Sequence, residues 1–288
     1  MNYIMYLACM LIWGLNFIAV KIQGTDASLE ISLLYRSLIA FLLFLILFII
    51  KGKNLNTKLN WLTVIGFGLC NFAISYLLLY YGTILSSSVL VTIIFSMKVI
   101  TTPILISIIF KTNIAKKIYI GGSLGMLSVV VTLVPEFNNV SGDFILGVTL
   151  AILGTLITSI GDVFSLYNSE KNIDPVIANM VGMFSATILL LTISTVTNQN
   201  FIIPDKVSYW IGLLYLSIMA SFVAWLFYLH LVKNIGASES SFMVAGFPAI
   251  GGIASIIIGE SQLNIYLILG IVFAILGAHT ALSKKNSK

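Results

Sequence analysis

Long apolar runs, separated by short polar or charged breaks, dominate the pattern of hydrophobic and polar positions along the chain. Each run stays apolar over about 17 residues or more, close to the roughly 20 residues that an α-helix needs to cross a bilayer. The runs do not alternate at a period of two, as the strands of a transmembrane β-barrel would. We therefore predict an all-α membrane protein with ten transmembrane helices, at residues 2–20, 31–50, 61–81, 86–110, 118–134, 144–167, 176–196, 209–230, 236–258 and 264–282.

The starts of these predicted helices recur at an interval of about 145 residues, so the chain divides into two halves of five helices. We expect a first repeat over residues 1–134, a second over 144–283 and a basic cytoplasmic tail at 284–288. Because five is odd, the second repeat enters the membrane from the opposite side, and the repeats are inverted. Inverted repeats are typical of transporters that alternate access to a site between them.

Composition supports the lipid environment. The chain is 59% hydrophobic and 9% charged, whereas soluble domains average roughly 45–50% and 25%. Ten spans leave no room for a sizeable soluble domain. The two cysteines, Cys9 and Cys70, lie inside apolar runs, which argues against a disulfide framework and a cysteine-ligated metal. We expect neither a cofactor nor a metal.

The positions of the basic residues predict an orientation. If the N-terminus is inside, two basic residues, Lys21 and Lys206, fall in outer loops and eleven fall in inner segments. The eleven are Lys51, Lys53, Lys58, Lys111, Lys116, Lys117, Lys171, Lys233, Lys284, Lys285 and Lys288. Since Lys and Arg accumulate in cytoplasmic loops, both termini are expected in the cytoplasm and the protein in the cytoplasmic membrane. The net charge of +5 is then a topology signal and does not indicate nucleic-acid binding.

Several motifs follow one another in a recognisable order. The first helix reads I-W-G-L-N-F-I-A-V-K over residues 12–21, and Arg36 lies in L-L-Y-R-S-L of the second. The ninth carries I-G-A-S-E-S-S at 235–241, G-F-P at 246–248 and I-I-I-G-E at 256–260. Together they resemble the EamA-type family of the drug/metabolite transporter superfamily. The resemblance implies a ten-helix transporter with a central cavity lined by both repeats, commonly an exporter of amino acids or other small metabolites.

The fourth helix departs from that family pattern, because S-M-K-V at residues 96–99 stands where proline and then glutamate are usual. Lys98 there is near mid-helix, about 18 Å from either membrane face at 1.5 Å per residue. A central lysine costs about 2.5–3.5 kcal/mol on insertion scales. It either anchors a substrate carboxylate or phosphate, or pairs with Asp162 to position helices. Asp162, near the inner end of the sixth helix, is a proton-coupling carboxylate, the partner of Lys98 or a solvated interfacial acid.

Other polar and aromatic residues within the spans are open to two interpretations. Arg36, near the outer face, either reaches the interface or caps a helix, or it lines an outer vestibule. Asn16 either bonds between helices or contacts a ligand, and the aromatic residues either pack or line the cavity. The candidate substrate-binding residues are Lys98, Asn16, Trp13, Tyr76, Tyr80, Trp225, Tyr228 and Phe247.

Two prolines and a series of glycines lie within the predicted spans. Pro103 and Pro248 are expected to break corresponding helices of the two halves, a pattern that marks transporter binding sites, although a packing kink is an equal alternative. Gly147, Gly154 and Gly161 recur every seven residues and predict close helix packing.

These features favour a secondary transporter that exports small anionic or zwitterionic metabolites by alternating access. No Walker A motif is present, so ATP is not the expected energy source. A flippase for lipid-linked sugars or other amphipathic molecules is an alternative within the same superfamily, and a membrane receptor or assembly subunit is the non-transport alternative. An intramembrane enzyme would need paired aspartates, a metal cluster or a serine–histidine arrangement, and we find none. The lipid bilayer is the other expected partner, and the oligomeric state stays open.

Overall fold

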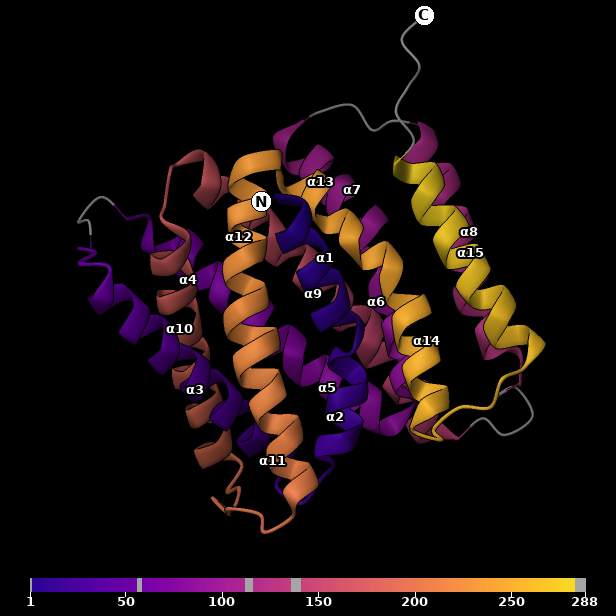
Figure 1. Ribbon diagram of the computed structural model, residues 1–288, viewed down its shortest axis with the longest axis horizontal. Helices are drawn as coiled ribbons and strands as arrows, with labels where there is room; N and C mark the ends of the chain where they lie inside the picture. Colours follow the sequence, from indigo (N-terminus) through magenta and orange to yellow (C-terminus); the bar gives the residue numbers. More distant parts are fainter. Residues whose placement is uncertain (1, 56–58, 112–115, 136–140, 283–288) are drawn as a thin grey trace, which may run out of the picture.

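The computed structural model describes residues 2–55, 59–111, 116–135 and 141–282, and within them the chain is helical with no strand (Figure 1). Seven helical stretches are long and apolar enough to cross a membrane. They comprise α1 (Asn2–Gly14) with α2 (Asn16–Gln23), α3 (Leu29–Ile50), α4 (Trp61–Gly68) with η1 (Leu69–Ile74) and α5 (Ser75–Leu85), α6 (Ser88–Ser96) with α7 (Lys98–Phe110), α9 (Gly142–Glu170), α10 (Pro175–Val196), and α11 (Val207–Leu214) with η3 (Tyr215–Val223) and α12 (Ala224–Ile235).

Three shorter apolar helices occupy the remaining predicted spans. They lie in α8 (Lys116–Leu133), in η4 (Phe242–Gly246) with α14 (Phe247–Ile257), and in α15 (Ile265–Leu282), and the short α13 (Ala237–Ser241) precedes η4. The all-helical prediction is therefore confirmed. The basic tail at 284–288 lies outside the described residues.

Several of the membrane-length stretches are not continuous α-helix. The first is interrupted at Leu15 and the fourth at Met97. The third and the seventh contain the π-helical segments η1 and η3, whose wider turns shift the direction of the side chains that follow. Such wide turns inside α-helices occur frequently at functional sites. All four interruptions lie next to the central pocket described below.

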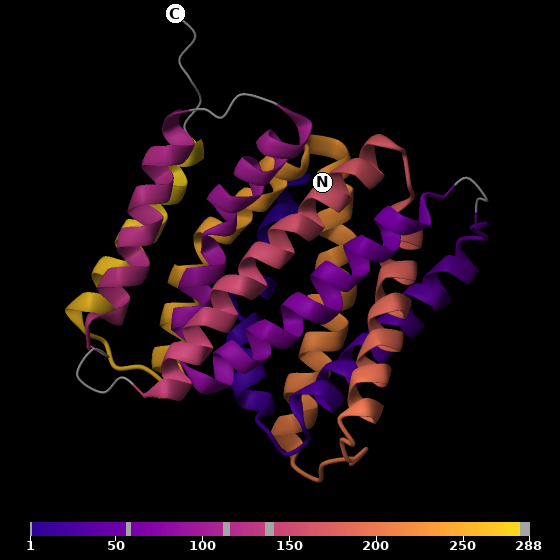
Figure 2. The same cartoon turned by 180° about the vertical axis from the view of Figure 1, so that it is seen from behind.

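The helices pack so that segments from the two halves of the chain lie side by side. α3 packs against α10, α5 against α9, α2 against α11, and α8 against α15. Figures 1 and 2 show the α8–α15 pair at one edge of the bundle and the α3–α10 pair at the other. The start of α1 and the end of α15 lie at the same end, which we call the upper end after Figure 1; α2 and α14 end at the lower end.

Glycines allow the closest of these helix approaches. A Cβ added to Gly68 of α4 would lie 2.3 Å from the Cα of Gly182 in α10. Gly147, Gly154 and Gly161 of α9 face Leu85, Leu79 and Asn71 respectively. The predicted glycine packing face is therefore confirmed, and it draws α9 close to the stretch that carries Tyr76.

The Gly68–Gly182 contact leads to a stability prediction. Gly68→Ala should destabilise the protein by about 1–3 kcal/mol, because the new methyl group forces α4 away from α10. The melting temperature of the purified protein in detergent reports this loss. Gly142→Ala is the matched control, because a Cβ there meets nothing within 4 Å. Equal melting temperatures for the two variants would contradict the close helix contact.

Candidate functional site

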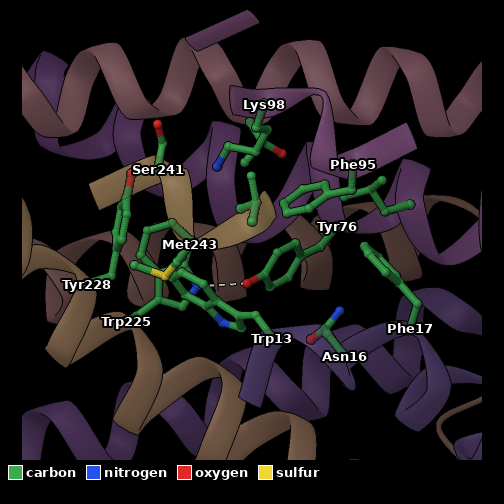
Figure 3. Close-up of a pocket in the computed structure, with 13 residues that line it drawn as sticks. Trp13, Asn16, Phe17, Tyr76, Phe95, Lys98, Trp225, Tyr228, Ser241 and Met243 are labelled. Carbon is green, nitrogen blue, oxygen red and sulfur yellow. Dashed lines mark hydrogen bonds between the residues drawn. The ribbon is translucent and has the colours of Figure 1, made fainter. Parts of the chain in front are cut away.

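A pocket lies among helices from both halves of the chain, with a volume of about 480 Å³ between its atoms (Figure 3). Its lining residues are Trp13, Asn16, Phe17, Tyr76, Leu79, Phe95, Lys98, Thr158, Trp225, Tyr228, Ser241, Met243 and Val244. The part that the centre of a water molecule can reach is about 20 Å³, which is room for about one water. The side chains that line the pocket therefore nearly fill it in this conformation.

Six of the eight predicted substrate-binding residues line this pocket: Lys98, Asn16, Trp13, Tyr76, Trp225 and Tyr228. The other two lie behind its walls. Tyr80 is fully buried and accepts a hydrogen bond from Arg36, and Phe247 is fully buried against Phe95, with the two rings parallel and their centroids 6.2 Å apart. Both can support the walls, but in this conformation neither reaches the cavity.

Lys98 forms a buried ion pair with Asp162. The ammonium nitrogen lies 3.0 Å from Oδ2 of Asp162, and both side chains are buried. Thr102 and Tyr228 donate hydrogen bonds to the two carboxylate oxygens, at 2.9 and 3.1 Å. The interpretation of Asp162 as a solvated interfacial acid is therefore wrong, because α9 runs past the pocket and places this carboxylate against Lys98 instead of water.

A break in the fourth stretch places Lys98 at the start of α7. The backbone tightens there, because Met97 N–H donates to the carbonyl of Ile94 instead of one four residues back. The interruption is thus at Met97, whereas α7 continues through Pro103, and this corrects the predicted position of the break. Proline removes a single hydrogen bond, so the helix can continue past it. Pro248 lies in the first turn of α14, directly after the 3₁₀ segment η4, where no N–H is needed.

Aromatic rings form one wall of the pocket. Trp13, Trp225 and Tyr228 contact one another edge to face, with centroids 5.1–5.3 Å apart. The indole N–H of Trp225 donates to the hydroxyl of Tyr76 at 2.7 Å, the dashed line in Figure 3. The indole N–H of Trp13 donates to the backbone carbonyl of Ala220 in η3. These bonds fix the polar atoms of the wall and leave apolar ring surface toward the cavity.

Arg36 is fully buried behind this wall. Its three nitrogens donate to Ser221, Tyr80 and Asn16, at 2.8, 3.2 and 3.3 Å. Its guanidinium carbon lies 4.2 Å from the ring centroid of Tyr76. The expectation that Arg36 reaches the membrane interface is therefore wrong, because four neutral groups surround it inside the bundle. Asn16 combines its two predicted roles, since it bonds to Arg36 across helices and also lines the pocket.

The lower end of the bundle is held together by Glu260, which follows α14. Its carboxylate accepts hydrogen bonds from the backbone N–H and the hydroxyl of Ser88, at the start of α6. It also lies 3.7 Å from the ammonium nitrogen of Lys21, in the last turn of α2. Glu260 thus ties together the ends of α2, α6 and α14, and residues of α2 and α6 line the pocket.

Sequence comparison decides the family. The model of the EamA-like transporter family matches residues 1–134 and 145–282. The chain belongs to the EamA-like transporter family. It is 25% identical to the "Uncharacterized transporter YyaM" of Bacillus subtilis (strain 168), over 97% of this chain and 92% of that protein. A crystal structure titled only "Crystal structure of protein" shares the fold, with a TM-score of 0.74 over 98% of this chain and 96% of that one, at 14% identity.

This membership identifies the chain as a multi-pass membrane protein of a transporter family. Among the described residues, no group of three or more His, Cys, Asp or Glu side chains is placed to hold a metal ion. The pocket of this EamA-like protein instead offers the ammonium group of Lys98, which is paired with Asp162, together with hydroxyl groups, the amide of Asn16 and aromatic surface. That set can bind a small molecule by charge, hydrogen bonds and ring contacts.

Sequence reasoning missed several residues of the pocket. Phe95 lies three residues before Lys98, and its ring centroid is 5.2 Å from the ammonium nitrogen. Phe17 follows Asn16 and contacts Phe95 edge to face. Adjacency to Lys98 and Asn16 was the available signal for these two. Met243 and Val244 had no such signal, because they reach the pocket through the 3₁₀ segment η4, which the apolar pattern does not reveal.

The Lys98–Asp162 pair gives a testable stability pattern. Asp162→Asn should destabilise the protein by about 3–5 kcal/mol, because it leaves a buried ammonium unpaired. The double variant Lys98→Met/Asp162→Asn should recover most of this loss, since no buried charge of the pair remains. Unfolding in detergent compares the stability of the wild type with those of Asp162→Asn, Lys98→Met and the double variant. Additive losses in the double variant would mean that the two side chains are not coupled.

Proposed function

We propose that this EamA-like protein is a secondary transporter that exports small metabolites such as amino acids across the cytoplasmic membrane by alternating access. The observation that carries the proposal is the narrow pocket beside a buried ion pair, lined by helices from both halves of the chain. Charged side chains within membrane spans usually mark the path of a substrate or an ion. The family supports transport, and the pocket supports a small polar cargo.

We infer that the seven long and three shorter apolar helices form two inverted repeats of five. The pairing of helices supports this, because a two-fold relation requires reciprocal contacts. The first stretch packs against the seventh long one (α2 on α11), and their proposed counterparts in the other half pack likewise (α9 on α5). The π-helical segments also correspond, since η1 and η3 interrupt the third helix of each proposed repeat. Binding sites of such transporters lie at the repeat interface.

Lys98 and Asp162 would exchange partners when a substrate binds. The carboxylate of a zwitterion replaces Asp162 beside the ammonium of Lys98, and its amino group takes the place of that ammonium beside Asp162. This exchange keeps every buried charge paired, which avoids the cost of an isolated ion. Trp13, Trp225 and Tyr76 then pack against the apolar part of the substrate.

Opening of the pocket requires helix movement, because the present cavity holds about one water. The interruptions at Leu15 and Met97 and the segment η4 are the places where a half-helix can move without breaking a continuous hydrogen-bond ladder. Lys21, Ser88 and Glu260 would close the lower end in this conformation. A concentration gradient across the membrane, or exchange for another solute, would supply the energy for transport.

We also propose that the upper end faces the cytoplasm, with both termini. Lys51 and Lys171 follow α3 and α9, and Lys233 lies in the last turn of α12; these three helices end at the upper end, whereas Lys21 and Lys206 belong to the lower end. The excess of lysine at the upper end agrees with the charge bias of cytoplasmic loops.

Transport can be tested by counterflow. Proteoliposomes loaded with a mixture of unlabelled amino acids should accumulate a labelled member of the mixture without ATP. Lys98→Ala should abolish accumulation while the protein level holds, because the substrate carboxylate loses its partner. Lys206→Ala is the control, since that lysine is exposed at the lower end. Full counterflow by Lys98→Ala would remove Lys98 from the site, and strict ATP dependence would contradict secondary transport.

Cysteine labelling tests the orientation. A membrane-impermeant maleimide applied to intact cells should label Lys206→Cys but label Lys51→Cys only after the membrane is opened. The wild type shows the background from Cys9 and Cys70. The opposite labelling order would invert the proposed topology.

A further inference from the structure

Among the described residues, Arg36 and Glu30 are the buried charged side chains of α3 that the proposed exchange at Lys98 does not use, and Glu30, in the first turn of α3, accepts a hydrogen bond from Tyr81. The positive charge of Lys98 is balanced by Asp162 at 3.0 Å. Among the described residues, no carboxylate forms an ion pair with Arg36, although its side chain is fully buried. With Lys98, Asp162 and Arg36 ionised, these three side chains together carry one net positive charge, and that charge resides on Arg36.

The neighbours of Arg36 accept hydrogen bonds from only some of its N–H donors. A guanidinium has five N–H donors, and Ser221, Tyr80 and Asn16 accept three of them. These acceptors are neutral, and the rings of Tyr76 and Tyr80 add cation–π contacts at 4.2 and 5.8 Å. A carboxylate or phosphate would bind the planar donor group in two places and neutralise it, which neutral acceptors cannot do.

Two of the side chains that contact Arg36 also line the pocket. Asn16 accepts from Arg36 through its amide oxygen and also lines the pocket, and Tyr76 has the guanidinium over its ring while it lines the pocket. In Figure 3, Asn16 and Lys98 lie at opposite edges of the pocket. Rotation of the Asn16 side chain would free the Nη2 edge of the guanidinium, whose face stays against the Tyr76 ring.

Arg36 also lies nearer the lower end than Lys98 does. It is seven residues after Leu29, where α3 begins at the lower end, whereas Lys98 is ten residues after Ser88. At 1.5 Å per residue these separations are about 10 and 15 Å. A solute that moves between Lys98 and the lower end therefore passes the level of Arg36.

We propose that Arg36 is a second anion-binding site, reached from the pocket when Asn16 releases it, and that it selects solutes carrying a carboxylate or phosphate. This inference rests on the proposed transport function, because it places Arg36 on the route from the pocket to the lower end. Asn16 acts as the neutral ligand that occupies Arg36 between passages. An anion that leaves Lys98 then transfers to Arg36 before it reaches the lower end.

A pair of probes that differ in charge tests the site. Benzoate and benzamide have nearly the same shape, but benzoate alone is an anion at neutral pH. The melting temperature of the full-length protein in detergent is measured as each probe is added. Benzoate should raise the melting temperature of the wild type at concentrations at least tenfold lower than benzamide does. Arg36→Gln should remove this preference, and Arg36→Lys should keep part of it. Lys206→Gln, which removes an exposed cation, should behave as the wild type does.

Asn16→Asp distinguishes an anion-binding role of Arg36 from a purely structural one, and this test does not depend on whether Arg36→Gln folds. The new carboxylate has the size of the amide and lies beside the guanidinium, so it should raise the melting temperature and also abolish the benzoate preference. Equal binding of the two probes by the wild type would overturn the proposal. A benzoate preference that survives in Arg36→Gln or in Asn16→Asp would also overturn it. So would a preference that is lost in Lys98→Gln but kept in Arg36→Gln. Absence of counterflow would refute transport but would leave this binding result intact.

Discussion

The buried ion pair between Lys98 and Asp162 is the interaction on which the rest of the structure depends. Inside a bilayer no water is available to solvate either charge, so each must find its partner within the protein. The break at Met97, the close approach of α9 through its glycines, and the hydroxyls of Thr102 and Tyr228 all serve to bring these charges together. The same break borders the pocket, because Phe95 and Lys98 on either side of Met97 line it.

Much of this arrangement could be predicted from the sequence, because lipid imposes strong rules on composition. Apolar length predicted the helices, and glycine spacing predicted the face that α9 packs. The apolar pattern could not reveal the π-helical and 3₁₀ segments, which depend on tertiary contacts. It left the roles of Arg36 and Asp162 open between alternatives, since position along a helix gives depth but not the neighbours that bury a side chain. The break assigned to Pro103 lies instead at Met97, because packing determined where the hydrogen-bond ladder tightens.

Charge in this bundle is distributed by depth in a way that suits a transporter. The ends are joined by ion pairs that can open, such as Lys53 with Asp174 at 2.6 Å. Burial alone would raise the pKa of Asp174, but the hydrogen bonds from Lys53 and from the backbone of Val176 lower it, so this carboxylate stays ionised at neutral pH. In the centre, one balanced pair and one unbalanced arginine face opposite sides of the same aromatic wall. The central claim is that the helices around this wall rearrange to open the pocket to one end at a time.

Spin-label distances test that claim most directly. Labels at residues 22 and 257 report on the lower end, where Glu260 joins α2, α6 and α14, and labels at 171 and 233 report on the upper end. Glu260→Gln weakens the lower junction, and the account predicts that the lower distance then lengthens while the upper one shortens. Distances that stay the same at both ends in wild type and variant would contradict alternating access about this pocket.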